Sequence, residues 1–336
     1  MAKVTAIIPN YNHARYLRRR IESVLTQTFA DLDVILMDDC SSDESRSILK
    51  EYAGNPQIQL MFNDRNSGST FKQWNKGIAS ATTDYVWLAE SDDYADPHFL
   101  ERLVPLLENN SNVGIAYCES TVIDASDHVL RTTHDDYRGS NRSNRWRTDF
   151  IINGRQECAD VFVRQNMIPN ASAALFRRSL FNAIGGADES MRLCGDWKLW
   201  VGMLLRADLA HVADPLNYYR THPDNVRSRA RNWQIFDETL TIAALIDDAL
   251  PVRTEDREFV RNRFADGWLN AWLHRDEFPA AMRYQLWQRL RQFDPTSRRR
   301  IFNRATKRMF SAARHGRFWR WTNHVIRRIV PHDYFP

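Results

Sequence analysis

The sequence predicts an α/β protein with a mostly parallel central sheet flanked by helices, followed by a helical C-terminal extension. Two observations carry this prediction. Within the first 90 residues, short apolar runs alternate with segments whose apolar residues recur at helical spacing, which is typical of a parallel sheet covered by helices on both faces. From residue 233 onward, apolar residues recur at helical spacing, which predicts a helical appendage.

The elements of the first half can be assigned in chain order. Apolar runs predict strands at residues 4–8, 34–37, 58–62 and 85–89. Helical spacing predicts helices that carry residues 17–25, 48–49 and 71–81. Ser41, Ser42 and Asp43 are suitable N-caps for the second of these helices. The order strand, loop, helix therefore repeats along this half of the chain.

Length and composition bound the class of protein. The chain has 336 residues, of which 43% are hydrophobic and 26% charged, as in a soluble globular protein. This length fits two domains, which we place at residues 1–226 and 227–336. No apolar run approaches the roughly 20 residues that cross a bilayer, and the N-terminus lacks the pattern of a signal peptide. We therefore expect a cytoplasmic protein, with its four cysteines as buried free thiols because no C-x-x-C pair occurs.

Acidic and amide side chains follow three of the predicted strands. The first strand is followed by Asn10-Tyr11-Asn12, the second by Asp38-Asp39 and the fourth by Glu90-Ser91-Asp92-Asp93. Ligands of open parallel sheets bind beyond the carboxyl ends of the strands, and converging carboxylates favour a divalent cation such as Mn²⁺ or Mg²⁺. For each loop alone, helix capping and turn formation are the competing explanation. Neither G-x-G-x-x-G nor a P-loop motif occurs, which disfavours a Rossmann dinucleotide site.

These loops belong to a longer series of sequence blocks. In chain order the blocks are residues 5–12 (TAIIPNYN), 23–29, 38–43 (DDCSSD), 66–68 with 75–77, 90–93 (ESDD), 170–177, 195–200 (GDWKLW) and 219–222 (YRTH). Together they resemble the family 2 glycosyltransferases of GT-A fold, of the kind found in bacterial polysaccharide and surface-glycan synthesis. The resemblance covers about residues 3–226 and implies a GT-A catalytic domain that binds a nucleotide sugar.

The resemblance implies a chemistry with two demands. Such enzymes move a sugar from a nucleoside diphosphate to an acceptor hydroxyl, commonly with inversion, and a UDP-sugar is the favoured donor here. The departing diphosphate needs its negative charge stabilised, which a divalent metal held by carboxylates can do. The hydroxyl needs a general base on the opposite face of the sugar. A glycan or a lipid-linked molecule is the expected acceptor.

The metal and diphosphate assignments follow from the same resemblance. Asp92 is similar to the metal ligand of the family, with Glu90 near the ribose or the metal and Ser91 between them in the donor site. The family commonly has Asp where this chain has Glu90. His222 resembles a residue that approaches the diphosphate or the metal.

The nucleobase site has its own set of residues. Asp39 resembles the carboxylate that reads the base by accepting its N–H, with Asp38 as the second candidate. Pro9 and Tyr11 would line the base pocket by stacking and edge contact.

The resemblance also names a general base. Asp196 follows Gly195 and begins an apolar-periodic segment, so we expect it at a helix start, where its carboxylate is stabilised. The alternative is that it serves as an N-cap and nothing more. Arg220 and Lys72 are candidate diphosphate contacts, although such side chains are often only surface charges.

The C-terminal segment is strongly basic. From Arg289 to the end, thirteen basic residues stand against two acidic ones, a net charge of +11 that leaves −7 for the preceding residues. Apolar residues within 302–313 and 318–329 predict two amphipathic helices with Arg on the opposite face. This composition is typical of a helix in an anionic membrane interface, so residues 298–330 are expected to attach the protein peripherally to the inner face of the cell membrane. The alternative is a helical hairpin docked on the protein; nucleic acid is an unlikely partner because no nucleic-acid motif accompanies the charge.

Two other function classes compete with a glycosyltransferase. A nucleotidyltransferase is also a metal-using α/β enzyme, but it usually has a Gly-rich loop with Lys or Arg after the first strand. This chain has Asn10-Tyr11-Asn12-His13-Ala14 there instead. A non-catalytic scaffold would act through the basic helices, and its function would survive neutralisation of Asp92 and Asp196.

Overall fold

The computed structural model describes residues 2–133, 144–222, 232–273 and 279–314. The chain divides into two compact units, residues 1–228 and 229–336.

The first unit is built on a ten-stranded sheet with the order β3-β2-β1-β4-β9-β6-β10-β5, in which β7 pairs with β6 and β8 with β10. The strands are β1 (Val4–Asn10), β2 (Leu32–Asp38), β3 (Ile58–Phe62), β4 (Tyr85–Leu88), β5 (Tyr94–Ala95), β6 (Val113–Ile123), β7 (Val129–Thr132), β8 (Phe150–Ile152), β9 (Ala174–Arg177) and β10 (Asp208–Arg220). The four strands predicted from the sequence are β1 to β4, within one or two residues at their ends.

The direction of the strands changes across the sheet. β3, β2, β1 and β4 are parallel neighbours, as predicted. β9 then lies antiparallel between β4 and β6, and β6 and β10 are again parallel. The predicted class, an α/β fold with a central sheet flanked by helices, is confirmed, and the sheet as a whole is mixed because β9 and the short strands β5, β7 and β8 all pair antiparallel.

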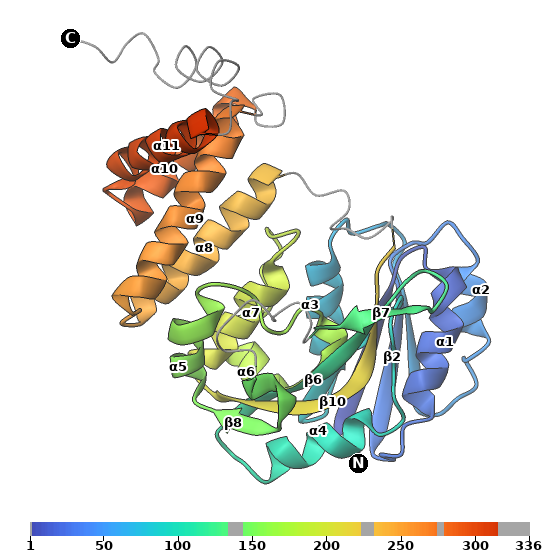
Figure 1. The fold of residues 1–336 in the computed structure, drawn as a ribbon. Coiled ribbons are helices and arrows are strands. Elements are labelled where there is room, and N and C mark those ends of the chain that lie inside the picture. The colour runs from blue at the N-terminus through green and yellow to red at the C-terminus, as the bar shows by residue number, and fades with distance from the viewer. Residues whose placement is uncertain (1, 134–143, 223–231, 274–278, 315–336) are drawn as a thin grey trace. The chain divides into compact units, whose positions relative to one another are not determined.

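Helices cover both faces of the sheet (Figure 1). One face packs against α1 (Ala14–Leu25), α2 (Ser45–Lys50) and α4 (Phe99–Glu108), and the other against α3 (Thr70–Ser80), α6 (Arg178–Ala183) and α7 (Gly195–Leu204). The alternation of β1 sets this division, because successive side chains of a strand point to opposite faces. Val4, Ala6 and Ile8 join the core beneath α1, whereas Ile7 lies against Gly77 of α3. Because β1 pairs in parallel with both β2 and β4, the carboxyl ends of these three strands meet at one edge of the sheet.

The second unit is helical, with α8 (Asn232–Ala249), α9 (Thr254–Leu273), α10 (Ala280–Phe293) and α11 (Ser297–Arg314). Its core holds buried apolar side chains from all four helices, including Leu240, Phe264, Leu290 and Ile301. None of the helices that the structure describes is long and apolar enough to span a membrane.

The arginines of α11 bear on the predicted membrane contact. Arg300 pairs with Glu258, and Arg304 and Arg308 pair with Asp266, so a stripe of α11 arginines faces an acidic stripe of α9. Arg300 is only 13% exposed in its side chain. These three arginines therefore pair across the contact between α9 and α11.

The structure describes the side chains of two predicted apolar positions of α11. Ala305 is buried, as predicted, whereas Phe302 is 68% exposed and Ile301, which was not predicted for the stripe, is buried in its place. The second predicted amphipathic helix, at 318–329, lies outside the described residues.

Candidate active site

The loops after β1 and β2 are joined by side-chain hydrogen bonds. Asn10 Nδ2 donates to Asp38 Oδ1 over 3.3 Å, and Asn12 Oδ1 accepts from the backbone N–H of Ser42 over 2.8 Å. Between the two asparagines, Tyr11 is 48% exposed. The joined loops therefore present the Tyr11 ring to solvent, where a base could stack on it.

The two aspartates after β2 have different surroundings. Asp38 is fully buried, and Arg46 Nε lies 3.1 Å from its Oδ2. Asp39 accepts from the hydroxyl of Ser67 over 2.7 Å and from Gln73 Nε2 over 3.0 Å. Both carboxylates hold loops in place, and Asp38 is the more enclosed of the two.

The next residue, Cys40, has a left-handed backbone with φ of +61°. Glycine adopts this region without cost, whereas a side chain costs about 1 kcal/mol or more there. The sequence has a sign of this strain, because the family frequently has Asp-Asp-Gly where this chain has Asp38-Asp39-Cys40. The small Cys side chain predicts little consequence, but the left-handed backbone is one that favours glycine. Of the predicted buried thiols, Cys118, Cys158 and Cys194 are buried, and Cys40 is partly exposed.

The loop after β4 holds three carboxylates close together. Glu90 Oε1 accepts from Trp74 Nε1 of α3 over 2.7 Å. Asp93 is 3% exposed and accepts from the backbone N–H of Arg220. Burial and the charge of Asp92 raise the pKa of Glu90 to about 8, and the same two causes raise the pKa of Asp93. A cation near this loop would relieve the repulsion between the carboxylates.

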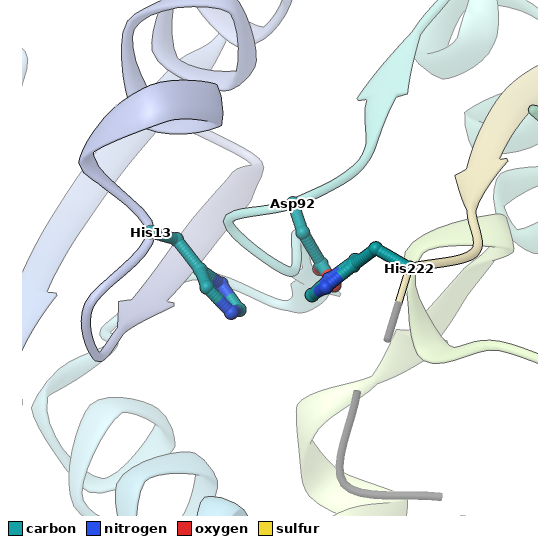
Figure 2. Close-up of side chains that lie close together, drawn as sticks. All are labelled: His13, Asp92 and His222. Atoms are coloured by element: carbon teal, nitrogen blue, oxygen red, sulfur yellow. The ribbon is translucent and has the colours of Figure 1, made fainter. Parts of the chain in front are cut away.

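Asp92 is one of three potential metal ligands that converge at this point (Figure 2). His13 comes from the loop after β1, Asp92 from the loop after β4, and His222 follows β10. The ligand atoms of the three side chains all lie within 4.8 Å of one another, and His222 Nε2 is 3.1 Å from Asp92 Oδ2. Burial acts to raise the pKa of Asp92, but the hydrogen bond from His222 and the charges of both histidines lower it below its ordinary value. An ionised carboxylate thus lies beside two imidazoles.

Two residues of the site, His13 and Arg20, are absent from the sequence predictions. His13 directly follows the block at residues 5–12, but nothing in the sequence shows that this loop meets the end of β10. The burial of Arg20 could have been predicted, because Arg20 lies on the apolar face of α1 together with Leu17, Ile21 and Val24.

Arg20 lies fully buried beneath the acidic loop. Its Nε donates to the carbonyl oxygen of Glu90 over 3.0 Å, and its guanidinium lies 5.0 Å from the centre of the Trp87 ring. Its Nη1 and Nη2 have no hydrogen-bond partner among the described residues. Burial lowers its pKa to about 10, although the charges of Asp93, Glu90 and Asp92 oppose this shift. Arg20 therefore remains a cation and offsets part of the negative charge above it.

Arg220 differs from its predicted placement against a diphosphate. The side chain is buried, with Nε donating to the carbonyl oxygen of Asp92 and Nη1 to that of Asp124. Nη2 pairs with Asp127 over 2.5 Å, and the guanidinium lies 4.4 Å from the centre of the Tyr16 ring. All three nitrogens are engaged within the protein, so Arg220 fixes the loop that carries Asp92.

Three further predicted residues are not among the three potential metal ligands. Pro9 is buried within β1, and Lys72 is exposed on α3. Ser91 is 2% exposed, and its hydroxyl lies 2.8 Å from His13 Nδ1. The position of Ser91 suits it to orienting His13.

Asp196 lies in the first turn of α7, at the predicted helix start. Its Oδ2 accepts from Asn166 Nδ2 over 3.1 Å. The helix begins close against α3, because a Cβ added at Gly195 would lie 2.4 Å from the ring of Phe71. That ring packs edge-on against Trp74, the residue that donates to Glu90. One chain of contacts thus links the segment of Asp196 to the acidic loop.

The fold of this chain is similar to that of solved GT-A glycosyltransferases. Staphylococcus aureus TarS 1–349 in complex with UDP-GlcNAc matches with a TM-score of 0.58 at 15% identity, over 88% of this chain and 92% of that one. The mannosyltransferase PcManGT from Pyrobaculum calidifontis, in complex with GDP-Man and Mn²⁺, matches with a TM-score of 0.57 at 14% identity, over 92% and 87% of the two chains. At these identities the likeness shows the fold.

The sequence comparisons give the family. The model of glycosyl transferase family 2 matches residues 5–185. An uncharacterized glycosyltransferase of Nostoc sp. is 28% identical over 232 residues, which are 66% of this chain and 66% of that protein. This chain belongs to glycosyl transferase family 2 and is a glycosyltransferase. The predicted family, fold and enzyme class are confirmed.

Proposed function

We propose that the protein transfers a sugar from a nucleoside diphosphate to an acceptor hydroxyl in a metal-dependent, inverting reaction. The observation that carries the proposal is the convergence of His222 and Asp92 beside Glu90, at the edge where the loops after β1, β2 and β4 meet. Solved proteins of the same fold hold UDP-GlcNAc in one case and GDP-Man with Mn²⁺ in another, which supports a donor of this class. A UDP-sugar remains our favoured donor.

The residues at this edge suit a divalent cation. Asp92 offers an ionised carboxylate and His222 an imidazole nitrogen 3.1 Å away, and Mn²⁺ accepts both kinds of ligand. Asp92 and His222 would hold the ion, which when bound would stabilise the charge that develops on the departing diphosphate. Glu90, whose carboxylate accepts from Trp74, is proposed to lie near the ribose or the metal.

The nucleobase would lie against the joined loops after β1 and β2. Tyr11 is exposed and can stack on a base. Asp39, held by Ser67 and Gln73, is the proposed acceptor for an N–H of the base. Because Asp38 is fully buried and Pro9 lies inside β1, we assign both to the support of these loops.

Asp196 is the proposed general base. It would accept the proton of the acceptor hydroxyl as the oxygen attacks the anomeric carbon on the face opposite the diphosphate. Asn166 fixes one oxygen of the carboxylate, and the start of α7 favours its ionised form. The acceptor would be a glycan or a lipid-linked molecule of bacterial surface-glycan synthesis. The naming of relatives as chondroitin synthase and poly(ribitol-phosphate) β-N-acetylglucosaminyltransferase supports a polymeric acceptor.

The test is release of nucleoside diphosphate from a panel of UDP-, GDP- and dTDP-sugars, with Mn²⁺ or with EDTA. We expect release from one nucleotide class, dependent on metal and lost in Asp92→Asn. Asp33→Asn, at an exposed position of β2, is the matched control and should keep full activity. Activity that is equal in EDTA, or unchanged in Asp92→Asn, would contradict the proposal.

A further inference from the structure

We propose that His13 is a third protein ligand, which makes the metal site a set of two imidazoles and one carboxylate that prefers Mn²⁺ or Co²⁺ to Mg²⁺. This inference rests on the proposed function, because it concerns the cation that Asp92 and His222 would hold. It adds a residue from the loop after β1, on the opposite side of the carboxylate loop from β10.

The geometry of the three side chains carries the inference. His13, Asp92 and His222 each bring one ligand atom within 4.8 Å of the other two. Ligands of one ion with bonds of about 2.0–2.2 Å cannot be farther apart than about 4.4 Å, so a small inward movement would place all three on one ion. The His13 and His222 rings lie 5.6 Å apart, centre to centre, at an angle of 85°, and both are directed toward the space beside Asp92 (Figure 2).

Ser91 supplies the support that a ligating histidine needs. Its hydroxyl lies 2.8 Å from His13 Nδ1 and is buried with the rest of the side chain. When Nδ1 donates its proton to this hydroxyl, Nε2 keeps its lone pair for a cation. Metal-bound histidines usually have such a partner on the second ring nitrogen.

The backbone that carries His13 is also fixed. Asn12 has a left-handed φ of 58°, and its Oδ1 accepts from both the backbone N–H and the hydroxyl of Ser42. The next residue, Ala14, donates its N–H to Asp43 Oδ2 over 2.9 Å. His13 is thus held from before and after, as a ligand on a rigid site requires.

A second imidazole changes the choice of metal. Mg²⁺ prefers oxygen ligands and keeps several waters, whereas imidazole favours later divalent metals. Three protein ligands also leave positions open for diphosphate oxygens. Removal of His13 should therefore cost much more affinity for Co²⁺ than for Mg²⁺, with the loss for Mn²⁺ between the two.

The experiment measures metal binding directly, on the full chain and without sugar donor. Pulsed EPR of bound Mn²⁺ detects coupling to ligand nitrogens, and titration calorimetry gives the affinities for Mn²⁺, Co²⁺ and Mg²⁺. We expect two imidazole nitrogens in the wild type and one in His13→Ala. We also expect Co²⁺ affinity to fall more than about tenfold, with a much smaller change for Mg²⁺.

Two further variants separate a ligand from a structural role. His98→Ala removes a histidine of the same unit that pairs with Asp96 and should change nothing. Ser91→Ala should weaken Co²⁺ binding about 10- to 100-fold while it keeps both nitrogens, and it serves as the second test if His13→Ala does not fold.

The failures of the two proposals are distinguishable. One nitrogen in the wild type, lost in His222→Ala and kept in His13→Ala, would overturn the role of His13 and leave the proposed function standing. Equal losses for Mg²⁺ and Co²⁺ in His13→Ala would also overturn it. Absence of any divalent metal binding by the wild type would overturn the three-ligand site, whereas the proposed function falls only if turnover is equal in EDTA.

Discussion

Asp196 is the residue on which the proposed chemistry depends most. Asp196→Asn keeps the size of the side chain and its place beside Asn166 but removes the proton acceptor. We expect kcat to fall by about 10²- to 10⁴-fold, with donor affinity unchanged. Steady-state kinetics and nucleotide binding by calorimetry measure the two effects. Asp188→Asn, which loses only an ion pair with Lys198, is the control, and unchanged turnover in Asp196→Asn would remove it from the role of base.

Cys40 offers a test of strain at a single residue. Because its φ is +61°, Cys40→Gly relieves a cost of about 1 kcal/mol and should leave the free energy of unfolding equal or higher. Cys40→Val should lower it by more than about 1 kcal/mol, because a β-branched side chain is least tolerated there. Urea unfolding of both variants measures this. A Val variant as stable as the Gly variant would show that the turn adopts another conformation.

At the scale of elements, the contact between α3 and α7 sets the position of Asp196. Gly195→Ala places a methyl group against the Phe71 ring, so we expect a loss of about 1–3 kcal/mol of stability and a loss of activity of up to about 10²-fold through displacement of Asp196. Phe71→Leu in the same chain should restore part of both. Gly54→Ala, where a Cβ meets nothing within 4 Å, should be harmless. Full activity of Gly195→Ala would show that the contact between α3 and α7 does not set the position of Asp196.

The charged stripes of α9 and α11 make a second prediction for elements. Arg304 and Arg308 share Asp266 as their partner, so Asp266→Ala leaves two arginines without it. Because Asp266 is 22% exposed in its side chain, we expect a loss of about 1 kcal/mol, weaker at high salt. Thermal unfolding at low and high NaCl measures this. A stability that does not depend on salt would mean that apolar packing alone joins the helices.

The sequence predicted the elements of the first 90 residues, the helical character of the second unit and the acidic residues of the site, and missed what depends on distant parts of the chain. Strands β1 to β4 could be read because periodicity is local. His13 could not be placed, since its neighbours Asp92 and His222 come from loops about 80 and 210 residues further along. The antiparallel direction of β9 could not be predicted either, because the apolar pattern of one strand does not determine which strands it pairs with.

At the scale of the whole molecule, we propose that the basic C-terminal residues attach the protein to an anionic membrane surface. Within residues 298–330, Arg300, Arg304 and Arg308 are used in helix packing. Arg317, Arg320, Arg327 and Arg328 lie outside the described residues. Replacing these four by Gln should reduce the fraction of protein that sediments with phosphatidylglycerol vesicles. Each basic residue near an anionic surface contributes about 1 kcal/mol to the free energy of binding.

The matched control replaces Arg300, Arg304 and Arg308 by Gln. We expect this variant to have a lower melting temperature than the wild type. Its binding to vesicles should be closer to that of the wild type than the binding of the variant at residues 317–328. Equal vesicle binding by the wild type and the variant at residues 317–328 would place any membrane contact elsewhere.

The central claim is that a nucleoside diphosphate binds at the edge of Asp92 through a divalent cation. It is tested most directly by the melting temperature of the wild type and of Asp92→Asn with UDP, GDP, dTDP, CDP or ADP, each with and without Mn²⁺. A ligand that binds only the folded protein raises its stability, by about 2.7 kcal/mol at a hundred times its Kd. We expect one diphosphate to stabilise the wild type only when Mn²⁺ is present, and Asp92→Asn not to respond. A shift of the same size without metal, or in Asp92→Asn, would contradict the account.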